Sequence, residues 1–346
     1  MRAAIFEVFQ GKIRIQNVPD PEPKDDGVVL KVMATGLCRS DWHGWMGHDN
    51  DIKLPHVPGH ELAGIVVEVG KEVTKFNIGD RVTVPFVCGC GVCPECTTGN
   101  HQVCDNQSQP GFTHWGSFAE YVAIDYADSN LIKLPDAMKD VTAASMGCRF
   151  ITAFRAIVDQ AEVVEGQFVA IHGCGGLGLS AVMIANALGA SVIAIDINED
   201  TLNMAAELGA VHTLDASSTI DIVDSIRDFT KGGVHVSMDA LGSAETAMNS
   251  INSLRKRGKH IQVGLMTGNH KNINVPMDKV LAHELEIIGS HGMQAYRYPD
   301  IFKMIDEGKL APEILVNRVI NLEEATHVLP MMNDFDHKGI MVINSF

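Results

Sequence analysis

The chain has 346 residues, of which 46% are hydrophobic, and a formal net charge of −16. This length exceeds one comfortable hydrophobic core, so we expect roughly two domains of about 150 residues. A surface this acidic repels phosphate backbones and anionic lipid, so nucleic acids and membranes are not favoured partners. The net charge does not distinguish among small neutral substrates.

Residues 1–18 alternate apolar and polar positions like a strand and lack the long apolar stretch of a signal peptide. No window approaches the roughly 18 uninterrupted apolar residues that span a bilayer. We therefore expect a cytoplasmic protein. In a reducing compartment, clustered cysteines are more often metal ligands than disulfides.

The part up to about residue 150 contains short β-like runs separated by Gly, Pro, Asp and Asn, at 28–36, 62–70, 81–86 and 118–124. This rhythm predicts an irregular β-rich domain.

From about residue 165 the rhythm changes to apolar strands that alternate with helices. The strands are expected at 168–173, 191–196, 234–242 and 258–265, and the helices at 177–189, 199–208 and 243–254. Such alternation predicts right-handed βαβ units on a doubly wound parallel sheet, hence an α/β protein. The tail adds two helices, 294–307 and 322–333, and a last strand at 339–346.

A glycine-rich loop follows the strand at 168–173 and opens the next helix. Gly173, Gly175 and Gly178 stand in G-x-G-x-x-G register. They would allow a tight turn, close approach of a pyrophosphate, and packing of helix on strand. The helix N-terminus then favours the phosphate charge.

The next strand ends in Asp196, eighteen residues after Gly178. A carboxylate there accepts hydrogen bonds from ribose hydroxyls and repels a 2′-phosphate. Asn198, Glu199 and Asp200 follow, with no cation to bind that phosphate. The loop and the aspartate predict binding of NAD rather than NADP.

Residues 88–104 contain five cysteines, four of which, Cys90, Cys93, Cys96 and Cys104, have the spacing C-x2-C-x2-C-x7-C. Four thiolates at these spacings suit a tetrahedral zinc and leave no position open for substrate, so the site would be structural. An iron–sulfur cluster is the main rival, and a nucleic-acid-binding zinc ribbon is disfavoured by the acidic chain. Cys88 is left outside the four.

A second set of candidate site residues is dispersed along the chain: Cys38, Ser40, His43, His60, Glu61 and Cys148. Taken singly, each has an ordinary structural explanation, for example a small core cysteine or a hydrogen-bonded loop histidine. Their spacing alone does not bring them together.

The motifs around these residues resemble those of a known family. GHELAGIVVEVGKEV (59–73) fits the pattern G-H-E-x2-G-x5-G-x2-V, CRSDWH (38–43) is similar to a first zinc-ligand motif, and the cysteine lobe has the matching spacing. Over nearly its full length the chain resembles the zinc-dependent alcohol dehydrogenases of the medium-chain dehydrogenase/reductase superfamily, of the yeast and bacterial type.

The resemblance implies that Cys38, His60 and Cys148 bind a catalytic zinc with an open fourth position, with Glu61 beside it. Ser40 would accept the alcohol proton and pass it through the nicotinamide ribose to His43 and solvent. Hydride would move to NAD from a zinc-bound alkoxide.

The resemblance also implies cofactor contacts. Gly176 would belong to the glycine loop, Arg39 and Lys338 would contact phosphate, and Thr152 and Leu177 would pack on the nicotinamide. The backbone of Val263, Gly264 and Leu265 would hold the carboxamide. Many relatives carry a Lys where this chain has Thr201. This difference affects one expected contact with the adenosine of the cofactor, but not the choice of cofactor. Three aromatic side chains would line the alcohol channel: Trp45, Phe86 and Trp115.

In domain terms, the resemblance implies a GroES-like catalytic domain at 1–150, completed by 289–346, and a Rossmann domain at 151–288. By the same resemblance, the stretch between Cys104 and Cys148, which is short compared with the long insertion of the vertebrate dimeric enzymes, implies a homotetramer. A dehydrogenase for a polyol, threonine or a formaldehyde adduct is the alternative enzyme. A non-catalytic NAD- and zinc-binding scaffold is the alternative class.

Overall fold

The computed structural model describes residues 1–334 and 338–346. The chain divides into two compact units. Unit 1 comprises Met1–Ile151 and Gly292–Phe346, and unit 2 comprises Thr152–His291.

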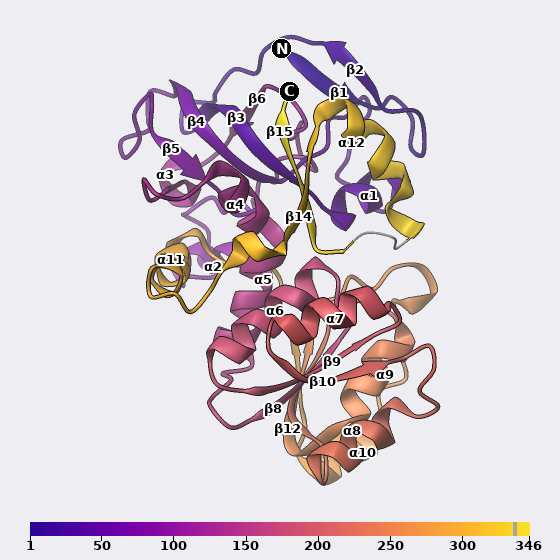
Figure 1. Cartoon of the computed structure of the whole chain (residues 1–346). Helices are drawn as coiled ribbons and strands as arrows, with labels where there is room; N and C mark the ends of the chain where they lie inside the picture. Colours follow the sequence, from indigo (N-terminus) through magenta and orange to yellow (C-terminus); the bar gives the residue numbers. More distant parts are fainter. Residues whose placement is uncertain (335–337) are drawn as a thin grey trace. The chain divides into compact units, whose positions relative to one another are not determined.

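Unit 1 is built on a mixed seven-stranded sheet, in which β14 and β15 are parallel and the other pairs are antiparallel (Figure 1). Its order is β14 (Val316–Asn321), β15 (Ile340–Ser345), β3 (Val28–Leu37), β4 (Glu61–Val69), β5 (Arg81–Thr83) and β7 (Ile132–Lys133), with β6 (Tyr121–Ile124) paired to β3. A separate two-stranded ribbon joins β1 (Arg2–Ile5) and β2 (Arg14–Asn17).

The helices of unit 1 are short and join these strands. They are α1 (Arg39–Met46), α2 (Pro94–Thr97), α3 (Ala127–Asn130), α4 (Asp140–Ser145), α11 (Tyr298–Asp306) and α12 (Leu322–Val328). The shorter segments are η1 (His101–Val103), the π turn η2 (Met146–Phe150), η5 (Ala295–Arg297), η6 (Pro312–Leu315) and η7 (Leu329–Asp334). One hydrophobic core lies under the pairing of β3, β4, β5 and β6, and a second collects side chains of β1, α1 and α12.

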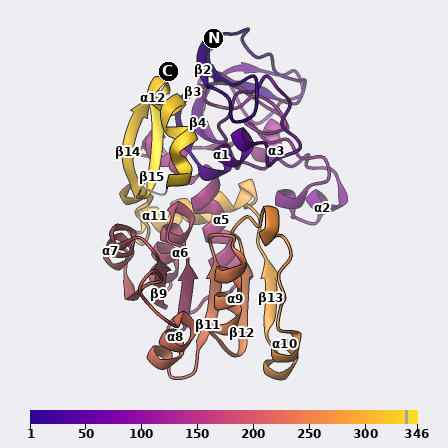
Figure 2. The same ribbon diagram turned by 90° about the vertical axis from the view of Figure 1, so that its right-hand side faces the viewer.

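Unit 2 is a parallel six-stranded sheet whose strands stand side by side in Figure 2. Its order is β10 (Ala210–Asp215), β9 (Ser191–Asp196), β8 (Phe168–His172), β11 (Val234–Asp239), β12 (Leu254–Gln262) and β13 (Glu286–Gly289). Counted along the chain this is the order 3-2-1-4-5-6 of a doubly wound dinucleotide-binding sheet. The predicted α/β class, which combines a β-rich domain and a parallel-sheet domain, is confirmed.

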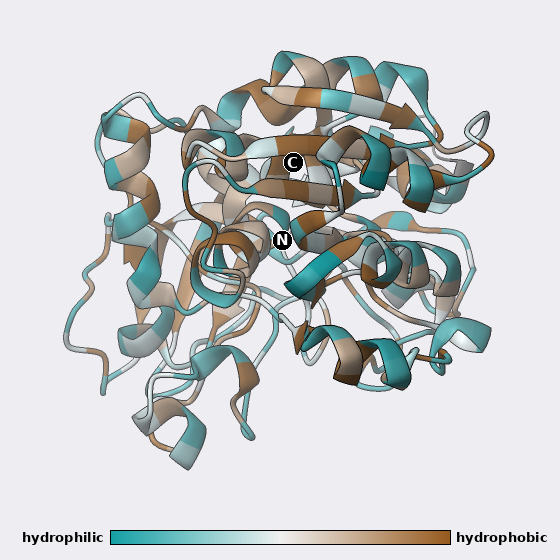
Figure 3. Ribbon diagram, turned by 90° about the horizontal axis from the view of Figure 1, so that it is seen from below, coloured by the Kyte–Doolittle hydropathy of each residue, from teal (hydrophilic) through white to brown (hydrophobic). Residues whose placement is uncertain are grey.

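The connections of unit 2 are mostly helical. They are α5 (Ile151–Phe154), η3 (Arg155–Gln160), α6 (Gly176–Ala187), α7 (Glu199–Glu207), α8 (Ile222–Thr230), α9 (Ala244–Asn252), η4 (Gly268–His270) and α10 (Met277–His283). Several helices carry hydrophilic and hydrophobic residues in alternation, as Figure 3 shows, which is the pattern of helices that bury one face.

Several elements of unit 2 lie outside the sequence predictions, among them α8, α10, β10 and β13. In α8 only Ile222 and Ile226, one turn apart, are buried, and the β-branched residues beside charges obscure the helical period. Strand β13 has four residues and no fully buried side chain, so it lacks the apolar run that marks a buried parallel strand.

The helical stretch Asp140–Gln160 is long and apolar enough to span a membrane by composition alone. Two buried arginines interrupt it, Arg149 and Arg155, and 67% of its most apolar window is buried inside the protein. These are the properties of an interior helix.

Candidate active site

Four of the dispersed residues converge in unit 1: Cys38, His60, Glu61 and Cys148. One ligand atom from each lies within 4.8 Å of the others. The register of the sheet explains this, since Gly36 of β3 pairs with Glu61 of β4 and so brings the two strand ends together. A Cβ on Gly36 would meet the Glu61 carboxylate at 2.1 Å, so only glycine fits there.

His60 has one ring nitrogen anchored and the other bare. Its Nδ1 lies 2.9 Å from Oδ1 of Asp41, and its Nε2 is buried with no hydrogen-bond partner among the described residues. Burial lowers the pKa of His60, but the charge and hydrogen bond of Asp41 outweigh it and raise the pKa well above its ordinary value. A carboxylate on Nδ1 fixes the tautomer that presents Nε2 to a metal.

Asp41 also positions the backbone around this imidazole. The N–H groups of Gly59 and Cys38 donate to its two carboxylate oxygens at 2.9 and 3.0 Å. Sequence reasoning missed Asp41, although it stands in the motif CRSDWH as the third residue of α1, where a carboxylate caps a helix start.

The two thiols of the cluster are hydrogen-bonded to each other. Cys38 precedes α1, and Cys148 lies in the π turn η2, a distortion that is common at functional sites. The hydrogen bond from Cys148 holds the pKa of Cys38 well below its ordinary value, and the same bond together with burial raises the pKa of Cys148.

Glu61 is clamped by Arg149, the residue after Cys148. The backbone N–H and Nε of Arg149 donate to Oε1 at 3.1 and 3.0 Å, and a terminal guanidinium nitrogen donates to Oε2. Burial raises the pKa of Glu61, and the Arg149 charge opposes that rise. Sequence reasoning also missed this ion pair, because its only sign in the sequence is a charged residue next to a candidate metal ligand in an apolar helix.

These observations fit zinc. Two thiols and a bare imidazole nitrogen are the donor set of a catalytic zinc that keeps one position open, and Glu61 is held by its own partner. A buried Nε2 without a hydrogen bond is costly unless something occupies it.

The cysteine lobe fits a second zinc. Ligand sulfurs of Cys90, Cys93, Cys96 and Cys104 lie within 4.8 Å of one another, and those of Cys93 and Cys104 are 3.6 Å apart. Zinc–sulfur bonds of about 2.3 Å in a tetrahedron require sulfur separations of about 3.8 Å. Backbone N–H groups of three residues, Cys90, Cys93 and Asn106, donate to these sulfurs.

Cys88 does not belong to this sulfur cluster. Its thiol donates to the Pro85 carbonyl at 3.6 Å, and its backbone pairs with Ser108. Burial raises the pKa of Cys88, which keeps the group a neutral core thiol.

The glycine loop of unit 2 has the geometry that a dinucleotide needs. Gly173 has φ +90°, and a Cβ on Gly178 would lie 1.9 Å from the Gly173 carbonyl oxygen. A Cβ on Gly175, by contrast, would meet nothing within 4 Å, so this backbone borders open space. Gly176 then begins α6, and Leu177 follows, half-buried.

Asp196 ends β9 and is hydrogen-bonded to the glycine loop. Its Oδ2 accepts the Cys174 N–H at 2.6 Å, and its Oδ1 accepts the N–H groups of Ile197 and Asn198. These bonds use three of the roughly four acceptor positions of a carboxylate. One position therefore remains for an external hydroxyl.

Other predicted cofactor residues lie at the same carboxyl edge of the sheet or just after the domain boundary. The N–H groups of Val263 and Gly264, directly after β12, donate to the Asp239 carbonyl, and Leu265 is exposed. Thr152 is buried and its hydroxyl has no partner among the described residues. Ligands of doubly wound sheets bind at this edge, where the strand order reverses between β8 and β11.

Comparison with known proteins agrees with both units. Residues 24–136 match the alcohol dehydrogenase GroES-like domain family, and residues 176–307 match the zinc-binding dehydrogenase family. An alcohol dehydrogenase of Geobacillus stearothermophilus is 32% identical, with 94% of each chain covered. An NAD-dependent alcohol dehydrogenase of Sulfurisphaera tokodaii is 32% identical over 99% of each.

The structure of the alcohol dehydrogenase of Aeropyrum pernix superposes with a TM-score of 0.90 at 30% identity, covering 99% of this chain and 100% of the other. The chain belongs to the zinc-dependent alcohol dehydrogenases. It is an oxidoreductase of the medium-chain superfamily, with residues that fit two zinc ions.

In this dehydrogenase, the residues expected to move the proton lie on α1. Ser40 and His43 are half-buried, and His43 Nδ1 lies 2.9 Å from Nδ1 of His48. Arg39, expected at the pyrophosphate, donates to the Met332 carbonyl and the Asn333 side chain. Lys338, half-buried, is the first described residue after 335–337.

Two phenylalanines flank the bare imidazole of the dehydrogenase. The ring centroids of Phe86 and Phe112 lie 6.1 and 5.1 Å from that of His60. Trp45 is buried beside Phe112 in a hydrophobic core and donates to the Gly11 carbonyl, and Trp115 packs at the margin of the same core. Phe112 was missed by sequence reasoning, because nothing in its local pattern separates it from an ordinary core ring.

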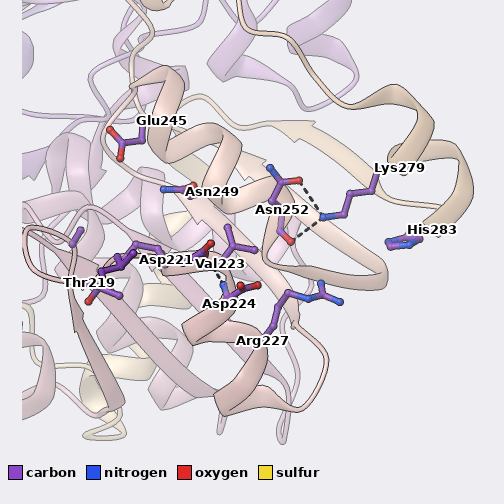
Figure 4. Close-up of a pocket in the computed structure, with 13 residues that line it drawn as sticks. Thr219, Asp221, Val223, Asp224, Arg227, Glu245, Asn249, Asn252, Lys279 and His283 are labelled. Atoms are coloured by element: carbon purple, nitrogen blue, oxygen red, sulfur yellow. Dashed lines mark hydrogen bonds between the residues drawn. The ribbon is translucent and has the colours of Figure 1, made fainter.

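A hollow of about 590 Å³ in unit 2 lies between α8, α9 and α10, as Figure 4 shows. Its lining includes Asp221, Arg227, Glu245, Lys279 and His283, and none of its lining residues belongs to the predicted site. This hollow therefore adds nothing to the assignment of the dehydrogenase site.

Proposed function

We propose that this dehydrogenase oxidises a small primary or secondary alcohol to an aldehyde or ketone, reversibly and with NAD, at a site formed by Cys38, His60 and Cys148. Two thiols converging on one bare, buried imidazole nitrogen carry this proposal. NAD-linked alcohol oxidation is the reaction of the family.

The side chains around the metal have different roles. Cys38, His60 and Cys148 would hold zinc, while Asp41 orients the imidazole and the helix start. Zinc, when bound, supplies a Lewis acid that lowers the pKa of an alcohol hydroxyl. Phe86 and Phe112 exclude water from the His60 face, which strengthens electrostatic interactions there.

The proton of the alcohol must leave the buried site, and Ser40 and His43 are the proposed carriers. Ser40 would accept the proton at its hydroxyl oxygen, and His43 would receive it at a ring nitrogen. Burial, followed by the charge of Arg39, lowers the pKa of His43 to about 4. His43 is therefore neutral at physiological pH and able to accept a proton.

The cofactor site is proposed at the carboxyl edge of the parallel sheet. The loop Gly173–Gly178 would hold the pyrophosphate, with Arg39 and Lys338 as further phosphate contacts, and Asp196 would accept a ribose hydroxyl. Thr152, Leu177 and the backbone of 263–265 would bind the nicotinamide end. NAD, when bound, accepts the hydride.

We expect Asp196→Ala to relax the preference for NAD over NADP. The substitution removes the negative charge that repels a 2′-phosphate and the last acceptor for the ribose. Ratios of kcat/KM for the two cofactors, in wild type and variant, measure the effect. A wild type that already prefers NADP would contradict the assignment of Asp196.

We expect Cys93→Ser to lose one zinc per chain, whereas Cys88→Ser keeps the full zinc content. Cys93 has its sulfur in the four-sulfur cluster, whereas Cys88 donates to a carbonyl inside a hydrophobic core. Metal analysis of the purified variants decides this. Loss of zinc from Cys88→Ser would mean that a different set of four sulfurs binds the metal.

The protein is proposed to be a cytoplasmic homotetramer. Exposed apolar side chains at the sheet edge of unit 2 support self-association: Met277, Leu281 and Ile287 are 63%, 81% and 42% exposed. Apolar residues beside an unpaired edge strand are typical of surfaces that another chain covers. Sedimentation of the purified protein tests the state.

The reaction is tested by NADH formation from a panel of ethanol, aromatic alcohols, sorbitol and threonine. We expect turnover of simple alcohols by the fully zinc-loaded protein. Turnover of sorbitol or threonine alone would mean that the substrate is a polyol or an amino alcohol and not a simple alcohol. Absence of turnover with every alcohol, at full zinc content, would remove the proposed reaction.

A further inference from the structure

A second histidine lies against the proposed proton carrier of helix α1. Nδ1 of His48 is 2.9 Å from Nδ1 of His43, and the ring centroids are 5.2 Å apart. His43 is half-buried and His48 is exposed. Nothing in the sequence motif of this region identifies His48 as part of the site.

The helix end places His48 there. Gly47 ends α1 in the left-handed conformation with φ +82°, and the N–H of His48 turns back to donate to the His43 carbonyl at 3.0 Å. This is the bond that closes a helix when glycine follows its last residue. A Cβ on Gly47 would also press on the Phe9 ring at 3.0 Å. The turn therefore fixes where residue 48 points.

A buried tryptophan holds both rings in place. The rings of His43 and His48 form T-shaped contacts with the indole of Trp42, with centroid distances of 5.0 and 5.8 Å, and Trp42 is 7% exposed. The Arg39 guanidinium lies over the same indole at 4.9 Å. The histidine pair is thus anchored to the core of unit 1 rather than free on the surface.

We propose that His48 is the proton-exit residue of this dehydrogenase, receiving the proton of alcohol oxidation from His43 and delivering it to solvent. The inference rests on the proposed function of the Ser40 and His43 path. Two neutral imidazoles that meet through Nδ1 share a single proton, with one nitrogen as donor and the other as acceptor.

The transfer balances in protons. A proton enters His43 at Nε2, the Nδ1 proton of His43 passes to the bare Nδ1 of His48, and the Nε2 proton of His48 passes to water or to a buffer base. The pair begins and ends neutral. One proton leaves for each alcohol oxidised, which matches the one proton that the reaction releases alongside NADH.

The test follows proton release directly. Single turnovers of the zinc-loaded enzyme with NAD and alcohol are recorded at pH 7 in weak buffer, with a pH-indicator dye for protons and absorbance for NADH. The variants are His48→Asn, whose amide can hydrogen-bond His43 but neither takes up nor passes on a proton, and His48→Ala. His327→Asn, an exposed histidine on α12, is the matched control.

We expect proton release to slow by about 10-fold or more in both His48 variants and to stay unchanged in His327→Asn, since positioned proton transfer typically contributes about 10²–10⁴-fold. Added imidazole should restore the rate in a concentration-dependent way, which a merely structural defect would not show. Zinc content and the KM for NAD should remain those of wild type.

The results that overturn the inference are distinct. Wild-type proton release in His48→Asn, together with slow release in His43→Ala, would mean that His43 delivers its proton to water without His48. Wild-type proton release in His43→Ala would mean that the proton does not leave through His43 and His48. A wild-type protein that oxidises no alcohol would instead remove the proposed function itself.

Discussion

Arg149→Met is expected to lower the free energy of unfolding by about 3–5 kcal/mol, because it leaves the Glu61 carboxylate buried without its partner. Glu61 is 0% exposed, so water cannot replace the guanidinium. Denaturant unfolding of the zinc-loaded protein measures the loss.

The deficit should depend on pH. Without the opposing charge of Arg149, burial raises the pKa of Glu61 further above its ordinary value of 4.5. The folded variant then binds a proton that the unfolded chain releases, so its stability falls as pH rises from about 4.5 through the raised pKa. A deficit that shrinks with rising pH would contradict this.

Two controls separate the ion pair from a general effect of losing arginine. Arg318→Met breaks a pair with Glu324 whose side chains are 51% and 42% exposed, and should cost no more than about 1 kcal/mol. Combining Glu61→Gln with Arg149→Met removes both charges and should recover much of the loss. A cost of less than about 1 kcal/mol for Arg149→Met alone would mean that Glu61 is not charged and buried as described.

Asp41→Ala is expected to weaken zinc binding at the Cys38, His60 and Cys148 site by about 10- to 100-fold. Asp41 fixes the His60 tautomer through Nδ1 and holds the backbone N–H of Cys38, so its loss frees two ligands at once. Competition with a chromophoric chelator measures the affinity.

The zinc of the four-cysteine lobe serves as an internal reference in the same titration, because no lobe residue contacts Asp41 through a described hydrogen bond. Asp51→Ala, an exposed aspartate after α1, is the matched control and should leave both affinities unchanged. If Asp41→Ala released zinc at the same chelator concentration as wild type, Asp41 would have no part in orienting His60.

Features encoded by local spacing could be predicted from the sequence. The sulfurs of Cys90, Cys93, Cys96 and Cys104 come together because short loops join them, and the glycine loop follows its strand directly. The alternation of strands and helices in unit 2 could also be predicted from the sequence, apart from short or mixed segments such as β13 and α8.

Features that depend on register between distant segments could not be predicted from spacing. Cys38 meets His60 through the pairing of Gly36 with Glu61, and Arg149 reaches Glu61 from the π turn η2. The family resemblance supplied the ligand set that spacing could not. It did not supply Asp41, Arg149, Phe112 or His48, whose roles follow from hydrogen bonds and ring contacts in the folded chain.

We propose that one of two zinc ions, held by Cys38, His60 and Cys148, supports NAD-linked oxidation of an alcohol. Stepwise zinc removal by a chelator, with metal content and NADH formation measured on the same sample, tests this proposal. We predict two zincs per chain at the start and turnover that falls in proportion to the loss of a single zinc, then returns when zinc is restored. Full turnover after that zinc has been removed would mean that this zinc takes no part in the reaction.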